Sequence, residues 1–175
     1  MANTNTPYVT GLFKDRESAE RAYQSLSERG YSQDDVNLVM SDDTRNRHFK
    51  SSSLPETELG NKAAEGAGIG GAIGGTVGAI AAAVAAIGTS LLIPGLGVVV
   101  AGPLAAALAG AGAGAAGGGL IGALIGLGIP EERVKQYEAG IQEGGILMGV
   151  RPRSDNDAAH IEQSWKSYNG EQIYR

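Results

Sequence analysis

The side chains that could perform acid–base or metal chemistry are few and scattered along the sequence. His48 and His160 are the only histidines, and the chain has no cysteine, which excludes disulfides and thiolate metal sites. A metal site needs three or four ligands in a fixed geometry, so two isolated histidines predict none. Glu131 and Glu132 follow Pro130, a pattern typical of a helix start rather than of an acid–base pair. We therefore expect neither a metal nor a cofactor.

Two other patterns resemble sites when taken alone. Asp42 and Asp43 lie close to Arg45 and Arg47 and could form a small polar site, but they also fit a solvated loop held by caps and surface ion pairs. The run 66–71 matches the dinucleotide pattern GxGxxG, yet no strand precedes it and the glycines continue far beyond it. Since no serine, threonine or lysine lies in a nucleophile motif, we expect no catalytic residue and no enzymatic activity.

Composition and charge narrow the classes of partner. The formal net charge is −5, from 19 acidic and 14 basic residues, so the chain lacks the basic surplus typical of nucleic-acid binding. The N-terminal residues are polar and do not form a signal peptide, which predicts that both flanks are cytoplasmic. No small-molecule substrate is indicated.

The elements must be organised around one long uncharged stretch, residues 66–130. Its 65 residues contain 20 glycines and 18 alanines but no Asp, Glu, Lys or Arg. Small residues recur every four positions on both sides of a turn signal at 92–97, which places them on one face of each of two helices. The glycines predicted to pack the helices together are Gly66, Gly70, Gly74, Gly78, Gly110, Gly114, Gly118, Gly122 and Gly126.

This spacing predicts a helical hairpin with arms at about 64–92 and 98–128, closely packed along its glycines as in membrane GxxxG pairs. Each arm would be about 40 Å long, enough to cross a bilayer core. The opposite face of the first arm carries Ile and Val residues that need lipid or an apolar partner. A low-complexity linker is the less favoured reading, because linkers are rich in serine and charge.

The flanking sequences repeat one pattern. Residues 8–13 and 35–40 are typical of strands and enclose a helix with Ala19, Ala22 and Leu26 on one face. Residues 145–150 and 171–174 enclose a second helix, whose Ala158, Ile161 and Trp165 follow the first set at a constant offset of 139 residues. A further helix is expected after Pro130. Two βαβ units predict an α+β fold, a ferredoxin-like split βαβ sandwich interrupted by the long helical hairpin.

The predicted organisation has three parts. Residues 8–60 form the first βαβ half and a polar loop, 62–129 the glycine-zipper hairpin, and 130–175 a helix and the second βαβ half. The second half is expected to pair with 8–40 as one discontinuous domain, with the strand at 8–13 beside the strand at 145–151.

The sequence also resembles a known family. The segments that carry the likeness are 9–13, 19–22, 35–45, 127–132 and 144–147. They resemble bacterial general stress proteins, the first part being similar to the heat-induced 17M-like domain and the whole layout to low-temperature-induced proteins with a glycine-rich core. The resemblance implies a stress-linked role without enzymatic activity, and it carries no functional residues.

Two functions are consistent with these patterns. In the first, the hairpin inserts in or associates with the cytoplasmic membrane, with both termini cytoplasmic, and mediates self-association; its partners are other copies of the chain and membrane lipid. The absence of Trp and Tyr at its ends and the weak Lys/Arg flank speak against this. In the alternative, the protein is a cytoplasmic oligomer, a bundle or filament built on the hairpin with ferredoxin-like domains outside.

Overall fold

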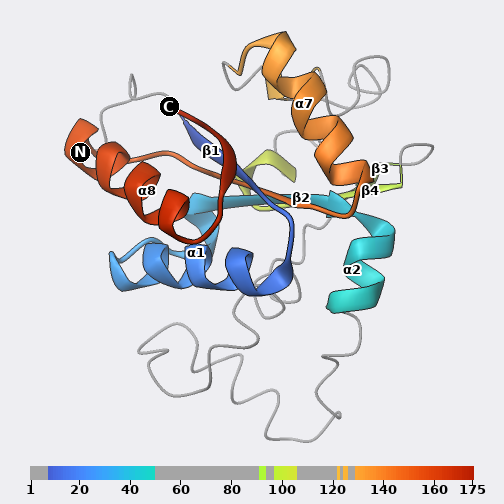
Figure 1. Ribbon diagram of the computed structural model, residues 1–175, viewed down its shortest axis with the longest axis horizontal. Helices are drawn as coiled ribbons and strands as arrows, with labels where there is room; N and C mark the ends of the chain where they lie inside the picture. The colour runs from blue at the N-terminus through green and yellow to red at the C-terminus, as the bar shows by residue number, and fades with distance from the viewer. Residues whose placement is uncertain (1–7, 50–90, 94–96, 106–121, 123, 126–128) are drawn as a thin grey trace, which may run out of the picture.

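The computed structural model describes residues 8–49, 91–93, 97–105, 122, 124–125 and 129–175. Within these residues, six strands form one sheet in the order β3-β4-β2-β5-β1-β6. Every neighbouring pair is antiparallel, and helices accompany the sheet (Figure 1). The protein therefore has an α+β fold, as the sequence predicts.

The first βαβ unit forms where its periodicity predicts. It consists of β1 (Val9–Phe13), α1 (Arg16–Glu28), a 3-10 turn (Gln33–Asp35) and β2 (Val36–Ser41). Asp15 begins α1 by accepting a hydrogen bond from the backbone N–H of Ser18 at 2.8 Å. Gly30 follows the helix with φ +81°, a conformation that glycine adopts without strain.

The second unit repeats this design. It consists of α7 (Glu131–Gln142), β5 (Ile146–Val150), α8 (Asp155–Ser167) and β6 (Glu171–Tyr174). Ser154 caps α8 through the backbone N–H of Asp157 at 3.1 Å. Trp165 is completely buried and meets Phe13 edge-on, with ring centroids 5.6 Å apart, so its predicted place in the core is confirmed.

The two units interlock in a single sheet. β5 lies between β1 and β2, with Gly149 opposite Thr10 on one side and Asn37 on the other. The predicted pairing of the strands at 8–13 and 145–151 is thus confirmed. β6 pairs with β1 at the sheet edge, where the sequence predicts a closing edge strand.

The region at the predicted hairpin turn has a different structure from the one expected. Leu91–Ile93 forms β3 and Val98–Ala101 forms β4, and β4 pairs with β2. The prediction that 91–92 and 98–101 are helical is therefore wrong. Three successive valines favour a strand, and Gly97 turns the chain with φ +58°.

The second predicted arm is not one continuous helix from 98 to 128. Leu104 and Leu124 line the same small cavity. A straight helix would separate these two residues by about 30 Å at 1.5 Å per residue. Both ends of the arm instead pack on the sheet, because their leucines are buried against its apolar side chains.

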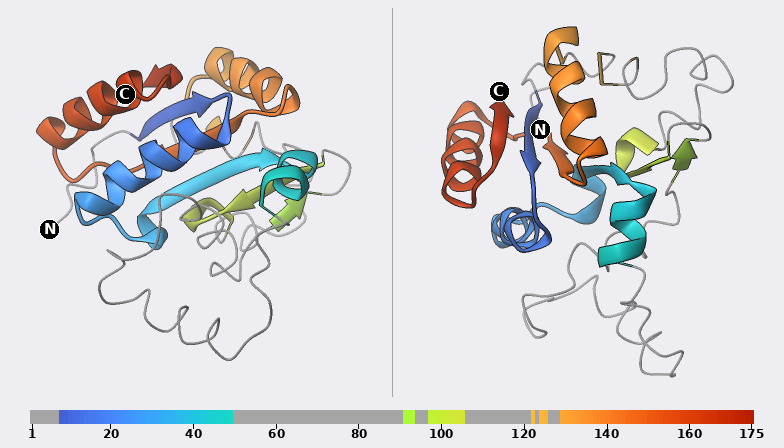
Figure 2. Two further views of the ribbon diagram at one scale, coloured as in Figure 1. Left: turned by 60° about the horizontal axis from the view of Figure 1, so that its bottom comes forward. Right: turned by 45° about the vertical axis from the view of Figure 1, so that its right-hand side comes forward.

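Two apolar clusters cover the two faces of the sheet. Helices α1 and α8 pack on one face, around Phe13, Leu38 and Trp165. Helix α7 and the residues around Leu104 and Leu124 pack on the other, around Val39 and Leu147. Figure 2 shows α1 and α8 together on one side and α7 apart from them. β2 is buried on both faces, whereas its alternating sequence predicts one buried face.

The polar loop predicted after β2 contains a short helix, α2 (Asp42–His48). Ser41 accepts a hydrogen bond from the backbone N–H of Thr44 at 3.1 Å and so caps it. The predicted loop, in which a helical turn was allowed for, is therefore a helix over these seven residues. The helix holds its acidic groups in the first turn and its basic groups in the last, which suits its dipole.

Candidate functional site

The glycines predicted to pack two helices together are almost all outside the described residues. Gly66, Gly70, Gly74, Gly78, Gly110, Gly114, Gly118 and Gly126 lie there, so the close packing remains a prediction. Gly122 is helical and exposed, and no described residue lies within 4 Å of the position that a Cβ would take. The described part of the chain thus gives Gly122 no close partner.

The residues considered for polar chemistry lie on three helices, α2, α7 and α8. His48 ends α2 and His160 is exposed on α8. Asp42 pairs with Arg45 across one turn at 3.2 Å, a surface ion pair of the kind the sequence indicates. Glu131 occupies the first turn of α7 and pairs with Lys135 at 3.0 Å.

Two kinds of feature are absent from the described residues. No group of three or more His, Asp or Glu side chains in this part of the chain is arranged to hold a metal ion. No helix in the same part has both the length and the apolar character needed to cross a bilayer.

A buried polar row crosses the sheet face that α7 covers. Thr10 on β1 and Asn37 on β2 are 2% and 3% exposed, and Gly149 on β5 lies between them in register. Since these residues alternate with the apolar ones that face α1 and α8, their side chains point to the α7 side. A polar pair separated by a glycine is unusual inside an otherwise apolar face and needs hydrogen-bond partners.

Tyr137 of α7 supplies a partner for Thr10. Its hydroxyl lies 2.9 Å from Thr10 Oγ1 and donates to the carbonyl of Gln172 at 2.6 Å. A hydroxyl has one proton, so Thr10 is the donor to Tyr137. Burial raises the pKa of Tyr137, which keeps the phenol protonated, although the Thr10 hydrogen bond opposes the shift.

Asn37 holds the start of the Gly/Ala-rich segment that follows β4. Its Oδ1 accepts a hydrogen bond from the backbone N–H of Leu104 at 2.7 Å. The adjacent Gly102 has φ +97° and lies so close to the carbonyl of Val36 that a Cβ would overlap it. Asn37 therefore acts as a remote cap that fixes the chain to β2 as it leaves the sheet.

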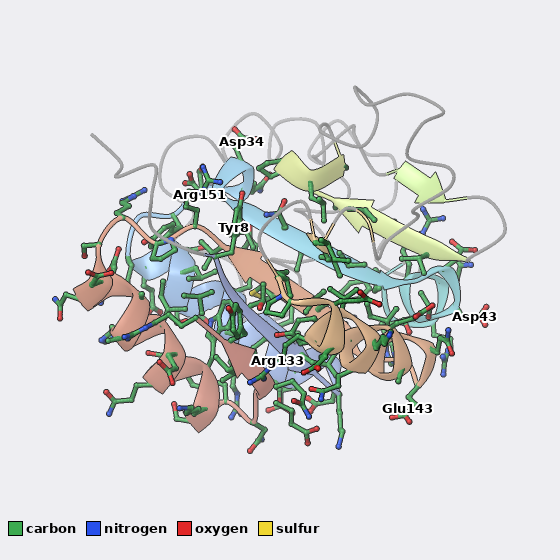
Figure 3. All side chains as sticks on the ribbon, turned by 90° about the horizontal axis from the view of Figure 1, so that it is seen from above. Tyr8, Asp34, Asp43, Arg133, Glu143 and Arg151 are labelled. Carbon is green, nitrogen blue, oxygen red and sulfur yellow. The ribbon has the colours of Figure 1, made fainter. Side chains whose placement is uncertain are left out.

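A small cavity of about 10 Å³ lies in this polar row. The described residues that line it are Tyr8, Thr10, Asn37, Val39, Leu104, Leu124, Leu147 and Gly149. The Arg151 guanidinium stacks over the Tyr8 ring, 4.8 Å from its centroid, at one end of the sheet (Figure 3). The cavity is too small for a metabolite, and the hydrogen bonds of the polar row join β1 to α7 and β2 to the segment after β4.

A second polar cluster joins the end of α1 to the start of α8 on the other face of the sheet. Asp157 accepts hydrogen bonds from the Tyr31 hydroxyl and from Arg29 Nε, the latter at 2.9 Å. Partial burial opposes ionisation of Asp157, but these hydrogen bonds outweigh it and lower its pKa. Burial, followed by the hydrogen bond to Asp157, raises the pKa of Tyr31 to about 12.

Sequence reasoning missed the polar row because its members are far apart in the chain. Thr10 and Tyr137 are separated by 127 positions, and Asn37 and Leu104 by 67. The available signal was a lone asparagine in a run of strand-forming apolar residues. That signal marks a polar group that needs a partner but does not identify the partner.

Comparison with known proteins adds no assignment: no family model, no curated protein and no solved structure matches this chain.

Proposed function

We propose that the chain is a non-enzymatic bacterial stress-response protein that acts by self-association. In this proposal an α+β domain is the platform, and the Gly/Ala-rich segments attached to it join copies of the chain. The small-residue faces that recur every four positions provide the contacts, since they let helix backbones approach closely.

The platform is a ferredoxin-like split βαβ sandwich in this proposal. Support comes from the strand order β2-β5-β1-β6 and from the packing of α1 and α8 on the same face. The β3–β4 hairpin would then be an addition at the β2 edge, and α7 a cover for the opposite face.

One observation favours assembly over a hairpin that crosses a membrane. The middle of the uncharged stretch, β3 and β4, is paired into the same sheet as both flanks. A spanning hairpin would place this turn on the far side of the bilayer from the flanks. The described residues that follow the two Gly/Ala-rich sequences, β3 and Leu124, both belong to the sheet domain.

The stress role rests on the resemblance of the sequence segments to bacterial general stress proteins. The absence of an enzymatic role is part of the same proposal. The hydrogen bonds of Asn37 and Asp157 support a non-enzymatic role, because these polar side chains join elements of the fold.

Light scattering of the full-length protein during gel filtration tests self-association. We expect a discrete oligomer that Gly74→Leu and Gly118→Leu disrupt, because a leucine would separate the closely packed faces. Ala85→Leu and Ala111→Leu, outside the four-residue series, are the matched controls and should leave the oligomer intact. A monomeric wild type, or equal effects of all four changes, would contradict the proposal.

Association with the cytoplasmic membrane is the second candidate function, favoured by the 65 residues without charge. Both termini would then be cytoplasmic. Carbonate extraction of a membrane fraction distinguishes the two: retention through carbonate with release by detergent indicates insertion, and full release supports the assembly alone.

A further inference from the structure

We propose that Asn169 is a deamidation site, at which the side-chain amide becomes a carboxylate when the C-terminal turn of α8 opens. The inference concerns the end of the sheet domain and does not depend on the proposed self-association. Asn169 is the only asparagine of the chain that precedes a glycine, and it is exposed to water. A glycine in the next position has no side chain to block the reaction and gives the backbone the freedom that it needs.

The reaction needs only water as a co-reactant. The backbone nitrogen of Gly170 attacks Cγ of Asn169, so that a C–N bond forms while the bond from Cγ to Nδ2 breaks. The proton of the Gly170 nitrogen passes through solvent to Nδ2, which leaves as ammonia, and a cyclic succinimide remains. Water then adds to one of the two ring carbonyls and opens the ring. Addition at Cγ gives aspartate, whereas addition at the backbone carbonyl gives isoaspartate, whose main chain runs through Cβ and Cγ.

The cap of α8 explains why asparagine and glycine stand together. The N–H of Gly170 donates to the carbonyl of Trp165 at 2.8 Å, and the N–H of Asn169 donates to the carbonyl of Lys166 at 3.3 Å. These two bonds form a Schellman motif, in which the residue after the helix is left-handed, and Asn169 has φ +59°. A Cβ on Gly170 would lie 2.8 Å from the Trp165 carbonyl oxygen, so this position requires glycine. The helix end therefore creates the reactive pair.

The same motif holds the reacting groups apart while it is closed. The Gly170 nitrogen is engaged with the Trp165 carbonyl, so it is not free to lose its proton and attack. In the left-handed conformation of Asn169, the nitrogen of the next residue also lies on the far side of the Cα–C bond from Cβ. That bond must rotate before Gly170 can reach Cγ. Deamidation consequently requires the hydrogen bond to Trp165 to break.

The strand that follows, β6, is well placed to open. It lies at the edge of the described sheet beside β1, and the register of this pair shifts between Thr10 and Leu12 (Figure 2). Glu171 and Gln172 begin the strand and are exposed. Gln172 has φ +50°, which is unusual for a residue with a side chain. Since exposed edge segments open at lower cost than a core, the reactive conformation is reached without unfolding of the whole domain.

Isoaspartate keeps β6 from returning to its closed position. It adds a further atom to the main chain between Tyr168 and Gly170, so the hydrogen bond from Gly170 to Trp165 cannot form again in the same geometry. Aspartate keeps the length of the main chain but places a negative charge at the C-terminal end of α8, where the helix dipole disfavours it. We therefore expect isoaspartate to loosen β6 more than aspartate does.

Mass spectrometry of tryptic peptides from the full chain follows the reaction. Trypsin releases Asn169 in the peptide 167–175 and Asn156 in the peptide 154–166. Asn156 is also exposed but is not followed by glycine, so it is the internal control. At mildly alkaline pH we expect conversion of Asn169 and none of Asn156, at a rate about tenfold to a hundredfold below that of a synthetic peptide 167–175. Equal rates in chain and peptide, or no conversion of Asn169 within about a hundred peptide half-lives, would overturn the proposal.

Three variants test the role of the opening. Asn169→Gly keeps access to the left-handed conformation but removes the amide, so it should show no conversion. Ile173→Ala removes a side chain that packs beside Gly170 against the core, and it should raise the rate at Asn169 at least about threefold. Ile129→Ala is the matched change on the opposite face of the sheet and should leave the rate unchanged. Equal rates in the two alanine variants would refute control by β6.

Amide hydrogen exchange measures the effect on β6. The isoaspartate form can be separated from the aspartate form and from the unmodified chain by chromatography. Its β6 amides should exchange at least about tenfold faster than those of the unmodified chain, with Asn169→Asp between the two. Equal exchange in the isoaspartate form and the unmodified chain would contradict the loosening of β6.

Discussion

Replacing Gly102 by alanine tests how the Gly/Ala-rich segment is attached to the sheet. Gly102 follows β4 with φ +97°, and an added Cβ would overlap the carbonyl oxygen of Val36 and lie 3.1 Å from Asn37 Cα. Both neighbours are backbone atoms of β2, so neither can move away without disturbing the pairing of β2 with β4.

Two separate effects determine how much Gly102→Ala lowers the free energy of unfolding. A non-glycine residue at positive φ costs roughly 1–2 kcal/mol, and overpacking against backbone adds about 1–3 kcal/mol. Gly102→Ala should therefore lower the free energy of unfolding by about 2–5 kcal/mol. Gly97→Ala is the control at the other end of β4: its φ is also positive, at +58°, but nothing described lies within 4 Å of the new methyl group. Gly97→Ala should therefore lower the free energy of unfolding by only about 1–2 kcal/mol.

Urea unfolding followed by tryptophan fluorescence measures the difference. Trp165 is the only tryptophan and is completely buried, so its emission reports loss of the core. Since Trp165 lies on the sheet face opposite Leu104, a lower midpoint in Gly102→Ala would also show that β4 unfolds together with the rest of the domain. Equal midpoints for Gly102→Ala and Gly97→Ala would refute the steric reasoning.

Three further changes test the packing of the domain. Tyr137→Phe leaves a hydroxyl on β1 and a carbonyl on β6 without their partner, and we expect it to lower the free energy of unfolding by about 1–3 kcal/mol in urea titrations. Asp157→Asn should destabilise at neutral pH: the pKa of Asp157 is lowered in the folded state, so its contribution is present above the ordinary value of 3.8 and is lost as pH falls through the lowered pKa. Urea midpoints of variant and wild type should converge once the pH lies below the lowered pKa of Asp157, and a constant difference would contradict this. Gly11→Ala places a methyl group 2.9 Å from Trp165 Cε3, so it should lower stability and alter the near-ultraviolet circular dichroism, which an unchanged spectrum would disprove.

Local chemistry was enough to predict the two βαβ units. Asp15 and Ser154 begin helices because short polar side chains can satisfy the free N–H groups of a first turn. Gly144 ends α7 because φ +101° is readily available only to glycine. Apolar spacing along each helix then identified its buried face, as at Val134, Tyr137 and Ile141. These signals act within a few residues and can be read without knowing the partner.

The structure of 91–101 depended on a partner far away in sequence. From sequence alone, the two predicted helices extend into this run from either side of the turn signal at 92–97, as far as residue 92 and from residue 98. Pairing with β2 gives Val98, Val99 and Val100 an ordered neighbour and buries all three, so the strand is favoured. The same pairing brings Leu104 to Asn37.

What the sequence determined by itself is therefore the helices and strands of the two βαβ units and the helix after Pro130, together with the buried face of each of these helices, because caps, glycine turns and periodicity are local. Tertiary structure decided the strand order, the formation of β3 and β4 where a helical hairpin turn was predicted, and the polar row of Thr10, Asn37 and Tyr137. These depend on contacts between residues 67 and 127 positions apart. Such contacts form only after the sheet has placed β1, β2 and α7 together, since hydrogen bonds across that separation have no local counterpart in the chain.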